Sequence, residues 1–174
     1  TLQSAIGQAA NLFTPLQLAN YCATIANGGT RYNVNIVKEI KSFDLSETVL
    51  AKEPSVAVET GISQKNIEIV QQGMRRVVTN SYTLTNGIGK VVNCAAKTGT
   101  SQVEHKIYGA KKVLTNGFFI TFAPYDEPEI AIAVAIEGGQ SGASCSSVAQ
   151  AIYEEYFKTQ QDNQVNNQTG ELLG

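Results

Sequence analysis

Apolar and small residues recur at helical spacing near the start of the chain. Thr14 is a favourable N-cap, and Pro15 suits the first helical position, where no backbone donor is needed. Apolar residues then follow at every third or fourth position as far as Ala26. The Asn-Gly-Gly sequence at 27–29 provides a left-handed stop. The pattern predicts a helix over 15–26.

Three more segments are assigned from the same kind of pattern. Ser63 is predicted to cap a helix over 64–78, whose apolar stripe should face the core (Ile67, Val70, Met74 and Val77). The Gly- and Asn-rich stretch 81–93 predicts a loop. An amphipathic helix over 146–157 should close the fold. The polar stretch 159–174 is expected to be a disordered tail.

Extended segments lie between and after these helices. Residues 33–43 alternate as a strand does, and 48–60 predict short strands around Pro54. Extended chain is expected again over 91–101, followed by a polar, basic loop at 104–112. The segments NGFFITFAP and IAIAVAI, separated by a short turn, predict an antiparallel hairpin. The second segment is apolar on both faces, which indicates an interior strand covered on both sides.

The order of these elements predicts one α+β domain over 1–158, with helices packed against an antiparallel sheet. Composition agrees with this class, because 43% of the 174 residues are hydrophobic and 16% are charged. The net charge of −2 argues against a nucleic-acid partner. No apolar run approaches the roughly 18 residues of a membrane span. Thr1 opens directly into LQSAIGQAA without a visible signal peptide, so we expect a fragment of a longer protein.

The cysteines and the single histidine do not indicate a metal site. Cys22, Cys94 and Cys145 are widely spaced and match no metal-binding spacing. Each is expected to be a small buried residue. His105 lies in the predicted polar loop, where a lone ligand is implausible.

The sequence CAAKTGTSQ, at 94–102, carries the clearest candidate chemistry. On a strand, Lys97 and Gly99 share one face, while Thr98 and Thr100 lie on the other. Glycine on a strand marks a close approach of a ligand or another backbone, and an edge strand binds an extended substrate as one more strand. The alternative is an ordinary edge strand with a solvated lysine.

The motifs around this run resemble those of the penicillin-binding protein transpeptidase domain. The resemblance is closest to its C-terminal half in class B proteins and covers residues 4 to about 158. The segments follow the family's order: AIGQ…TPLQLANYCATIANGGTRY, IVKEI, GMRRVV, AAKTGTSQ, NGFFITFAPYDEPEIAIAVAIEGG and the final helix. Ala9 is a local departure, because the family usually has glycine after IGQ.

The resemblance implies a serine β-lactamase-like fold and a serine acyltransferase of the cell wall. Its substrates would be peptidoglycan stem peptides ending in D-Ala-D-Ala, and β-lactams would mimic them. Lys97 would support the catalytic network electrostatically, and Thr98 and Thr100 would contact the substrate carboxylate. The backbone N–H of Thr100 would complete the oxyanion hole, while Gly99 leaves room for close approach. The resemblance implies no cofactor or metal. It does imply an extracytoplasmic protein anchored by an upstream segment.

Two of the three family signatures are missing from the chain. The signatures are Ser-x-x-Lys, Ser-x-Asn and Lys-Thr-Gly, and no lysine here has a serine three residues before it. Ser-x-Asn is also absent, and the similar Ser-x-Asp at 42–44 lies downstream of the TPLQLA helix, on the wrong side for the family. Because acyl transfer requires a nucleophile and its base in contact, the chain alone should be inactive. It would need the N-terminal half of the same protein.

Other functions remain open on the residues alone. One is a non-catalytic module of cell-wall assembly, although an inactive site would not require the complete KTGTSQ sequence. Others are related Lys-Thr-Gly enzymes, namely a D,D-carboxypeptidase, a serine β-lactamase or a β-lactam sensor. The TPLQLA helix and the GFFITFAP segment favour the transpeptidase.

Overall fold

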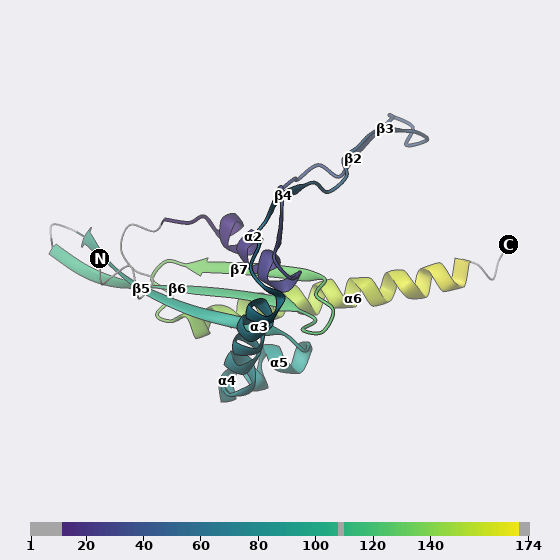
Figure 1. Cartoon of the computed structure of the whole chain (residues 1–174). Helices are drawn as coiled ribbons and strands as arrows, with labels where there is room; N and C mark the ends of the chain where they lie inside the picture. The colour runs from purple at the N-terminus through teal and green to yellow at the C-terminus, as the bar shows by residue number, and fades with distance from the viewer. Residues whose placement is uncertain (1–11, 108–109, 171–174) are drawn as a thin grey trace.

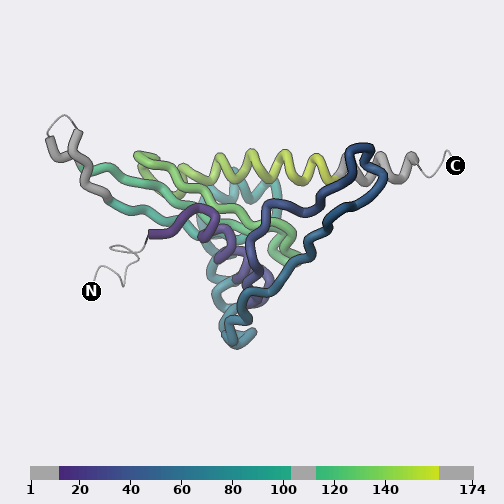
Figure 2. The backbone as a smooth tube through the Cα atoms, turned by 90° about the horizontal axis from the view of Figure 1, so that it is seen from above, coloured from purple at the N-terminus to yellow at the C-terminus, as the bar shows by residue number. Residues whose placement is uncertain are grey.

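A computed structural model describes the backbone of residues 12–107 and 110–170, and the side chains of 12–102 and 113–160. The AIGQ segment with Ala9, and the side chain of His105, lie outside this part. The described chain is α+β, as predicted, with helices on both faces of an antiparallel sheet (Figures 1 and 2).

The main sheet has three strands in the order β5-β6-β7. Strand β5 is Ala95–Ile107, β6 is Ala110–Ala123 and β7 is Ile130–Ile136, each antiparallel to its neighbour. The predicted hairpin between the last two strands is confirmed. The predicted loop at 104–112 is wrong over 104–107 and 110–112, where β5 and β6 continue and pair as far as Ile107 and Ala110. Backbone hydrogen bonds between strands do not require apolar side chains, so the ladder extends into polar sequence.

Helices cover the two faces of this sheet with separate clusters of buried residues. Helix α2 (Pro15–Ala26) and the middle of α3 (Gln64–Thr79) cover one face, around Ala95 and Phe122. Helix α6 (Ser146–Gly170) covers the opposite face, around Phe119 (Figure 2). Helices α2 and α6 therefore contact the two faces of β7, as its apolar pattern predicted, although Ala135 remains exposed.

The two N-terminal helix predictions hold in most details. Thr14 forms a capping box with Gln17, and positive φ angles at Gly28 and Gly29 follow the end of α2. Ser63 occupies the N-cap of α3 without a side-chain capping bond. Of the predicted α3 stripe, Ile67 and Met74 are buried and Val77 is half-buried, but Val70 is exposed; Val78 is buried instead.

The predicted loop at 81–93 is wrong. It contains two short helices, α4 (Tyr82–Asn86) and α5 (Ile88–Val91). Ser81 caps α4 by accepting a hydrogen bond from the backbone N–H of Leu84. Leu84 and Ile88 are then buried beneath the α6 face of the sheet. Capping and tertiary burial outweigh the poor helix propensity of this stretch.

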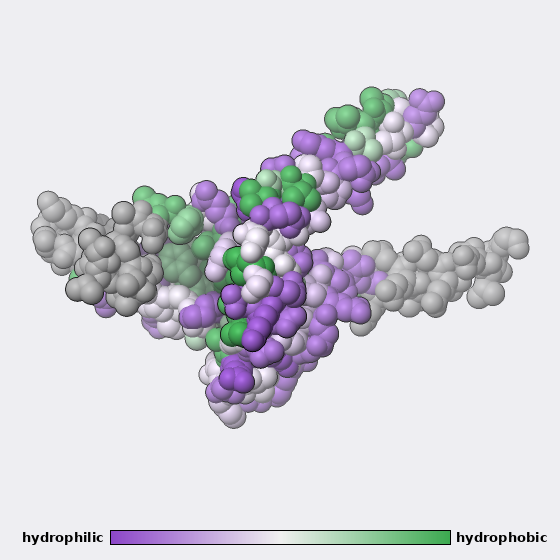
Figure 3. All heavy atoms as spheres, viewed as in Figure 1, coloured by the Kyte–Doolittle hydropathy of each residue, from purple (hydrophilic) through white to green (hydrophobic). Residues whose placement is uncertain are grey.

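Residues 30–59 form an arm that projects from the body of the molecule (Figure 1). Its base pairs β1 (Thr30–Tyr32) with β4 (Val56–Glu59), and its outer part pairs β2 (Glu39–Lys41) with β3 (Thr48–Ala51). The short strands predicted around Pro54 are confirmed, whereas only part of 33–43 is a strand. Apolar side chains at the tip, including Phe43 and Leu45, are exposed (Figure 3).

The C-terminal part begins with a 3₁₀ turn, η1 (Gly142–Cys145), which leads into α6. Ala149 and Tyr153 are buried along the face of α6 that meets the sheet, as its amphipathic pattern predicted. A disordered tail was predicted from residue 159, whereas α6 continues to Gly170. Extending a formed helix is far easier than starting one, which accounts for a helical backbone in polar sequence. No helix in the described ranges is long and apolar enough to cross a membrane.

A buried hydrogen-bonded triad ties β5, β6 and α6 together. The Thr121 hydroxyl donates to the carbonyl of Ala95 at 2.8 Å, and its oxygen lies 3.0 Å from the Tyr153 hydroxyl. Since the single threonine proton is already used, Tyr153 is the donor to Thr121. Burial raises the pKa of the Tyr153 phenol, which keeps the proton that this bond requires.

Thr121→Val should lower the free energy of unfolding by about 1–3 kcal/mol, because it leaves the Tyr153 hydroxyl and the Ala95 carbonyl without this partner. Thr121→Ser keeps the hydroxyl and serves as the control. Urea unfolding of both variants measures the difference. Equal stabilities would mean that the triad contributes nothing beyond packing.

Candidate active site

The Lys-Thr-Gly-Thr run at 97–100 lies on β5, which is an edge of the three-stranded sheet. Its backbone pairs with β6 on one side, and the opposite side carries no strand within the described chain. Lys97 and Thr100 are exposed, while Thr98 and Gly99 are half-buried. The run therefore lies on an open sheet edge, which is the position that the sequence analysis required for binding an extended substrate.

The register of β5 with β6 separates the four side chains onto two faces. Lys97 pairs with Ile120 and Gly99 with Phe118, on the side covered by α2. Thr98 pairs with Phe119 and therefore faces α6, as does Thr100. The predicted division of the run between faces is confirmed.

Two local contacts fix the polar groups of the run. The Lys97 ammonium donates to the backbone carbonyl of Thr98. The hydroxyl of Thr100 accepts a hydrogen bond of 3.2 Å from the backbone N–H of Gly142, at the start of η1. That bond uses one acceptor position of the hydroxyl and leaves its O–H free to donate.

The start of β5 is held by a second group of contacts. Arg75 donates from Nη1 to the carbonyl of Cys94 at 2.8 Å, and its guanidinium lies 6.0 Å from the ring centre of Tyr125. The backbone N–H of Tyr125 donates to the carbonyl of Asn93 at 2.7 Å. These bonds anchor β5 just before the Lys-Thr-Gly-Thr run, and sequence reasoning did not identify them.

The described residues contain no activated nucleophile. Cys22, Cys94 and Cys145 are fully buried, as predicted, and none is in a disulfide. Burial raises the pKa of each thiol, that of Cys22 to about 12, so all three stay protonated at neutral pH. Among the hydrogen bonds of the described side chains, none joins a serine hydroxyl to a lysine. No cluster of metal-ligating side chains occurs there either.

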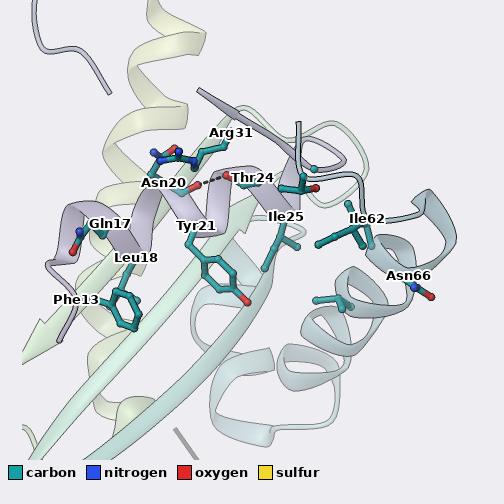
Figure 4. A pocket seen from close by; sticks show the side chains of 14 residues that line it. Phe13, Gln17, Leu18, Asn20, Tyr21, Thr24, Ile25, Arg31, Ile62 and Asn66 are labelled. Atoms are coloured by element: carbon teal, nitrogen blue, oxygen red, sulfur yellow. Dashed lines mark hydrogen bonds between the residues drawn. The ribbon is translucent and has the colours of Figure 1, made fainter. Parts of the chain in front are cut away.

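A cavity of about 560 Å³ lies away from this run, between α2, β1 and α3. Its wall is largely apolar, with Phe13, Leu18 and Tyr21 from the α2 side facing Ile62 (Figure 4). Val70 also lines it, which explains why this member of the predicted core stripe is exposed. The sequence pattern predicted that the whole apolar stripe of α3 would be buried. It did not predict that Val70 would be left exposed in a cavity.

Comparison with known proteins identifies the family. The sequence model of the penicillin-binding protein transpeptidase domain matches residues 1–158. The chain belongs to the penicillin-binding protein transpeptidase family. The resemblance stated from the sequence is thereby confirmed, and the sheet with its covering helices is part of the serine β-lactamase-like fold of these domains.

Relatives of known name agree with this assignment. The chain is 33% identical to penicillin-binding protein 2A of Bacillus subtilis, over 94% of this chain and 25% of that protein. It is 28% identical to the peptidoglycan D,D-transpeptidase MrdA of Acinetobacter baumannii, over 95% of this chain and 25% of that protein. The chain thus spans about a quarter of the length of these curated relatives.

Solved structures of the family superpose well. Penicillin-binding protein A from M. tuberculosis, in an imipenem acyl-enzyme complex, matches with a TM-score of 0.76 and 26% identity. The match covers 89% of this chain and 33% of that one. Penicillin-binding protein 2B from Streptococcus pneumoniae matches with a TM-score of 0.68 and 28% identity, over 84% of this chain and 25% of that one.

Proposed function

We propose that this chain is the C-terminal part of a D,D-transpeptidase that cross-links peptidoglycan stem peptides through a serine acyl-enzyme. The observation that carries the proposal is the Lys-Thr-Gly-Thr run on an open sheet edge in a member of this family. An open edge allows an extended peptide to bind beside β5 as a further strand. The same edge would receive β-lactams, as supported by the acyl-enzyme complexes known for penicillin-binding protein A.

Backbone direction supports an oxyanion-binding role for Thr100. In an antiparallel strand, the N–H and C=O of one residue point to the same side, and this side alternates along the chain. The Thr98 carbonyl accepts a hydrogen bond from the Lys97 ammonium, and we infer that this carbonyl faces the open edge. The backbone N–H of Thr100, two residues on, then also faces that edge. A donor held there stabilises the negative oxygen that forms during acyl transfer.

The side chains of the run take the remaining roles. The Lys97 ammonium provides positive charge beside the reacting groups and the substrate carboxylate. The hydroxyls of Thr98 and Thr100 bind that carboxylate. Gly99 has no side chain and so leaves the surface open for a ligand to approach. A Cβ added at this position would lie 3.3 Å from the Cβ of Phe118. None of these steps requires a metal or another cofactor.

The nucleophile and its activating lysine would come from the N-terminal half of the same protein. In this proposal the complete protein acts outside the cytoplasm and is held at the membrane by a segment upstream of this chain.

The chain alone should form no covalent adduct with a fluorescent penicillin, because it contains no Ser-x-x-Lys and its cysteines are buried and protonated. The full-length protein should gain one adduct per molecule. Intact-mass analysis after incubation distinguishes the two. A stoichiometric mass increase on the chain alone would contradict the proposed origin of the nucleophile, and its absence from the full-length protein would contradict the proposed function.

A further inference from the structure

The η1 turn lies directly against the part of β5 that carries the proposed carboxylate ligand. Besides donating to Thr100, Gly142 sits against the backbone of β5 and β6. A Cβ at Gly142 would come within 2.4 Å of the Phe118 carbonyl oxygen, 2.5 Å of the Gly99 carbonyl oxygen and 2.7 Å of the Gly99 nitrogen. All three are backbone atoms, which cannot rotate away. Only glycine fits at this position without moving η1 off the strand.

A second glycine completes the contact from the side of the sheet. Gly117 pairs with Thr100 across β5 and β6. A Cβ there would lie 2.6 Å from the Ser141 carbonyl oxygen and 2.8 Å from the Cys145 Sγ. The two glycines therefore let η1 approach the sheet closely at Thr100, and Gly142 is buried there while Thr100 remains exposed.

We propose that Gly142 is a positioning residue for the Thr100 hydroxyl. Its N–H occupies one lone pair of that hydroxyl, which restricts rotation about the C–O bond and directs the remaining O–H toward the open edge. A donor already oriented toward a carboxylate loses less freedom on binding than one that rotates. This inference rests on the proposed function. It adds that Gly142 of η1, 42 residues after Thr100 in the sequence, orients the hydroxyl that binds the carboxylate.

The hydrogen bond itself is tested by amide exchange in the full-length protein. Thr100→Val removes the acceptor and should speed exchange of the Gly142 amide, whereas Thr100→Ser keeps the hydroxyl and should preserve protection. Unchanged protection in Thr100→Val would overturn the proposal. This measurement does not depend on activity, so it remains valid even if the full-length protein is not acylated.

The functional role is tested with a penicillin and its methyl ester, which differ only in the carboxylate. Gly142→Ala should slow acylation by the acid about tenfold, the size of one hydrogen bond to a charged group, and leave the ester nearly unaffected. In a Thr100→Val background, Gly142→Ala should add little further loss for the acid, because the group it positions is gone. Gly73→Ala, where an added Cβ meets nothing within 4 Å, is the matched control and should leave both rates unchanged.

Each other outcome has a distinct meaning. Equal losses for acid and ester, or losses that multiply with Thr100→Val, would show a general structural effect and overturn the positioning role. If Gly142→Ala does not fold, the variants Thr100→Val and Thr100→Ser provide the test. The proposal is supported if Thr100→Val slows acylation by the acid and speeds exchange of the Gly142 amide, while Thr100→Ser does neither. Absence of acylation in the unmodified full-length protein would instead reject the proposed function.

Discussion

Lys97→Ala in the full-length protein should slow acylation by a fluorescent penicillin about 100-fold or more. The ammonium is exposed on an open strand edge, and its proposed role is to stabilise negative charge in the reacting complex. Its only described hydrogen bond is to the carbonyl of Thr98, the next residue. The free energy of unfolding should therefore change by less than about 0.5 kcal/mol. Stopped-flow acylation and urea unfolding measure the two effects separately.

The matched control is Lys90→Ala, which removes an exposed lysine from α5, away from the β5 edge. It should change neither the acylation rate nor stability. If Lys97→Ala loses stability in proportion to its activity, the lysine is an ordinary structural residue of an edge strand. If both variants lose activity equally, the effect comes from net charge and the site has been misplaced.

The position of the Lys-Thr-Gly-Thr run on a strand was predictable because it depends on local sequence. Four consecutive residues on a strand fix their own division between faces, and the order of motifs identifies the family. The contact between Thr100 and Gly142 was not predictable. It joins residues 42 apart, and a glycine after a strand suggests only a turn until the close approach of η1 is seen. The Arg75 contact with Cys94 is hidden for the same reason.

The fold was predictable where hydrophobic period and capping agree, as in α2 and in the hairpin of β6 and β7. Predictions failed where tertiary contacts outweigh local preference. The glycines and asparagines of 81–93 predicted a loop. The segment instead forms two short helices, α4 and α5, which bury Leu84 and Ile88. The polar sequence at 104–112 predicted a loop, but continued pairing between β5 and β6 keeps the backbone of 104–107 and 110–112 extended.

The chain studied alone should associate through β7. This strand pairs with β6 on one side only, and within the described chain no strand occupies its other side. Its sequence, IAIAVAI, offers no charge or proline to discourage a new partner, and an unpaired apolar edge presents a row of free backbone donors and acceptors. In the proposed full-length protein, a strand of the N-terminal half would fill this position. Without it, two copies should pair edge to edge.

Size-exclusion chromatography with light scattering over a concentration series measures this association. Ala135→Lys places a charge on the exposed part of β7 and should shift the chain toward monomer, because two copies would bring like charges together. Gln72→Lys adds the same charge on an exposed position of α3 and should leave the dimer intact. In the monomeric variant, amides over 130–136 should alternate between slow and fast exchange, since only every second one points toward β6. A monomer of the unmodified chain with uniformly slow exchange over 130–136 would mean that β7 is paired on both sides, and the strand order at this edge would then have to be revised.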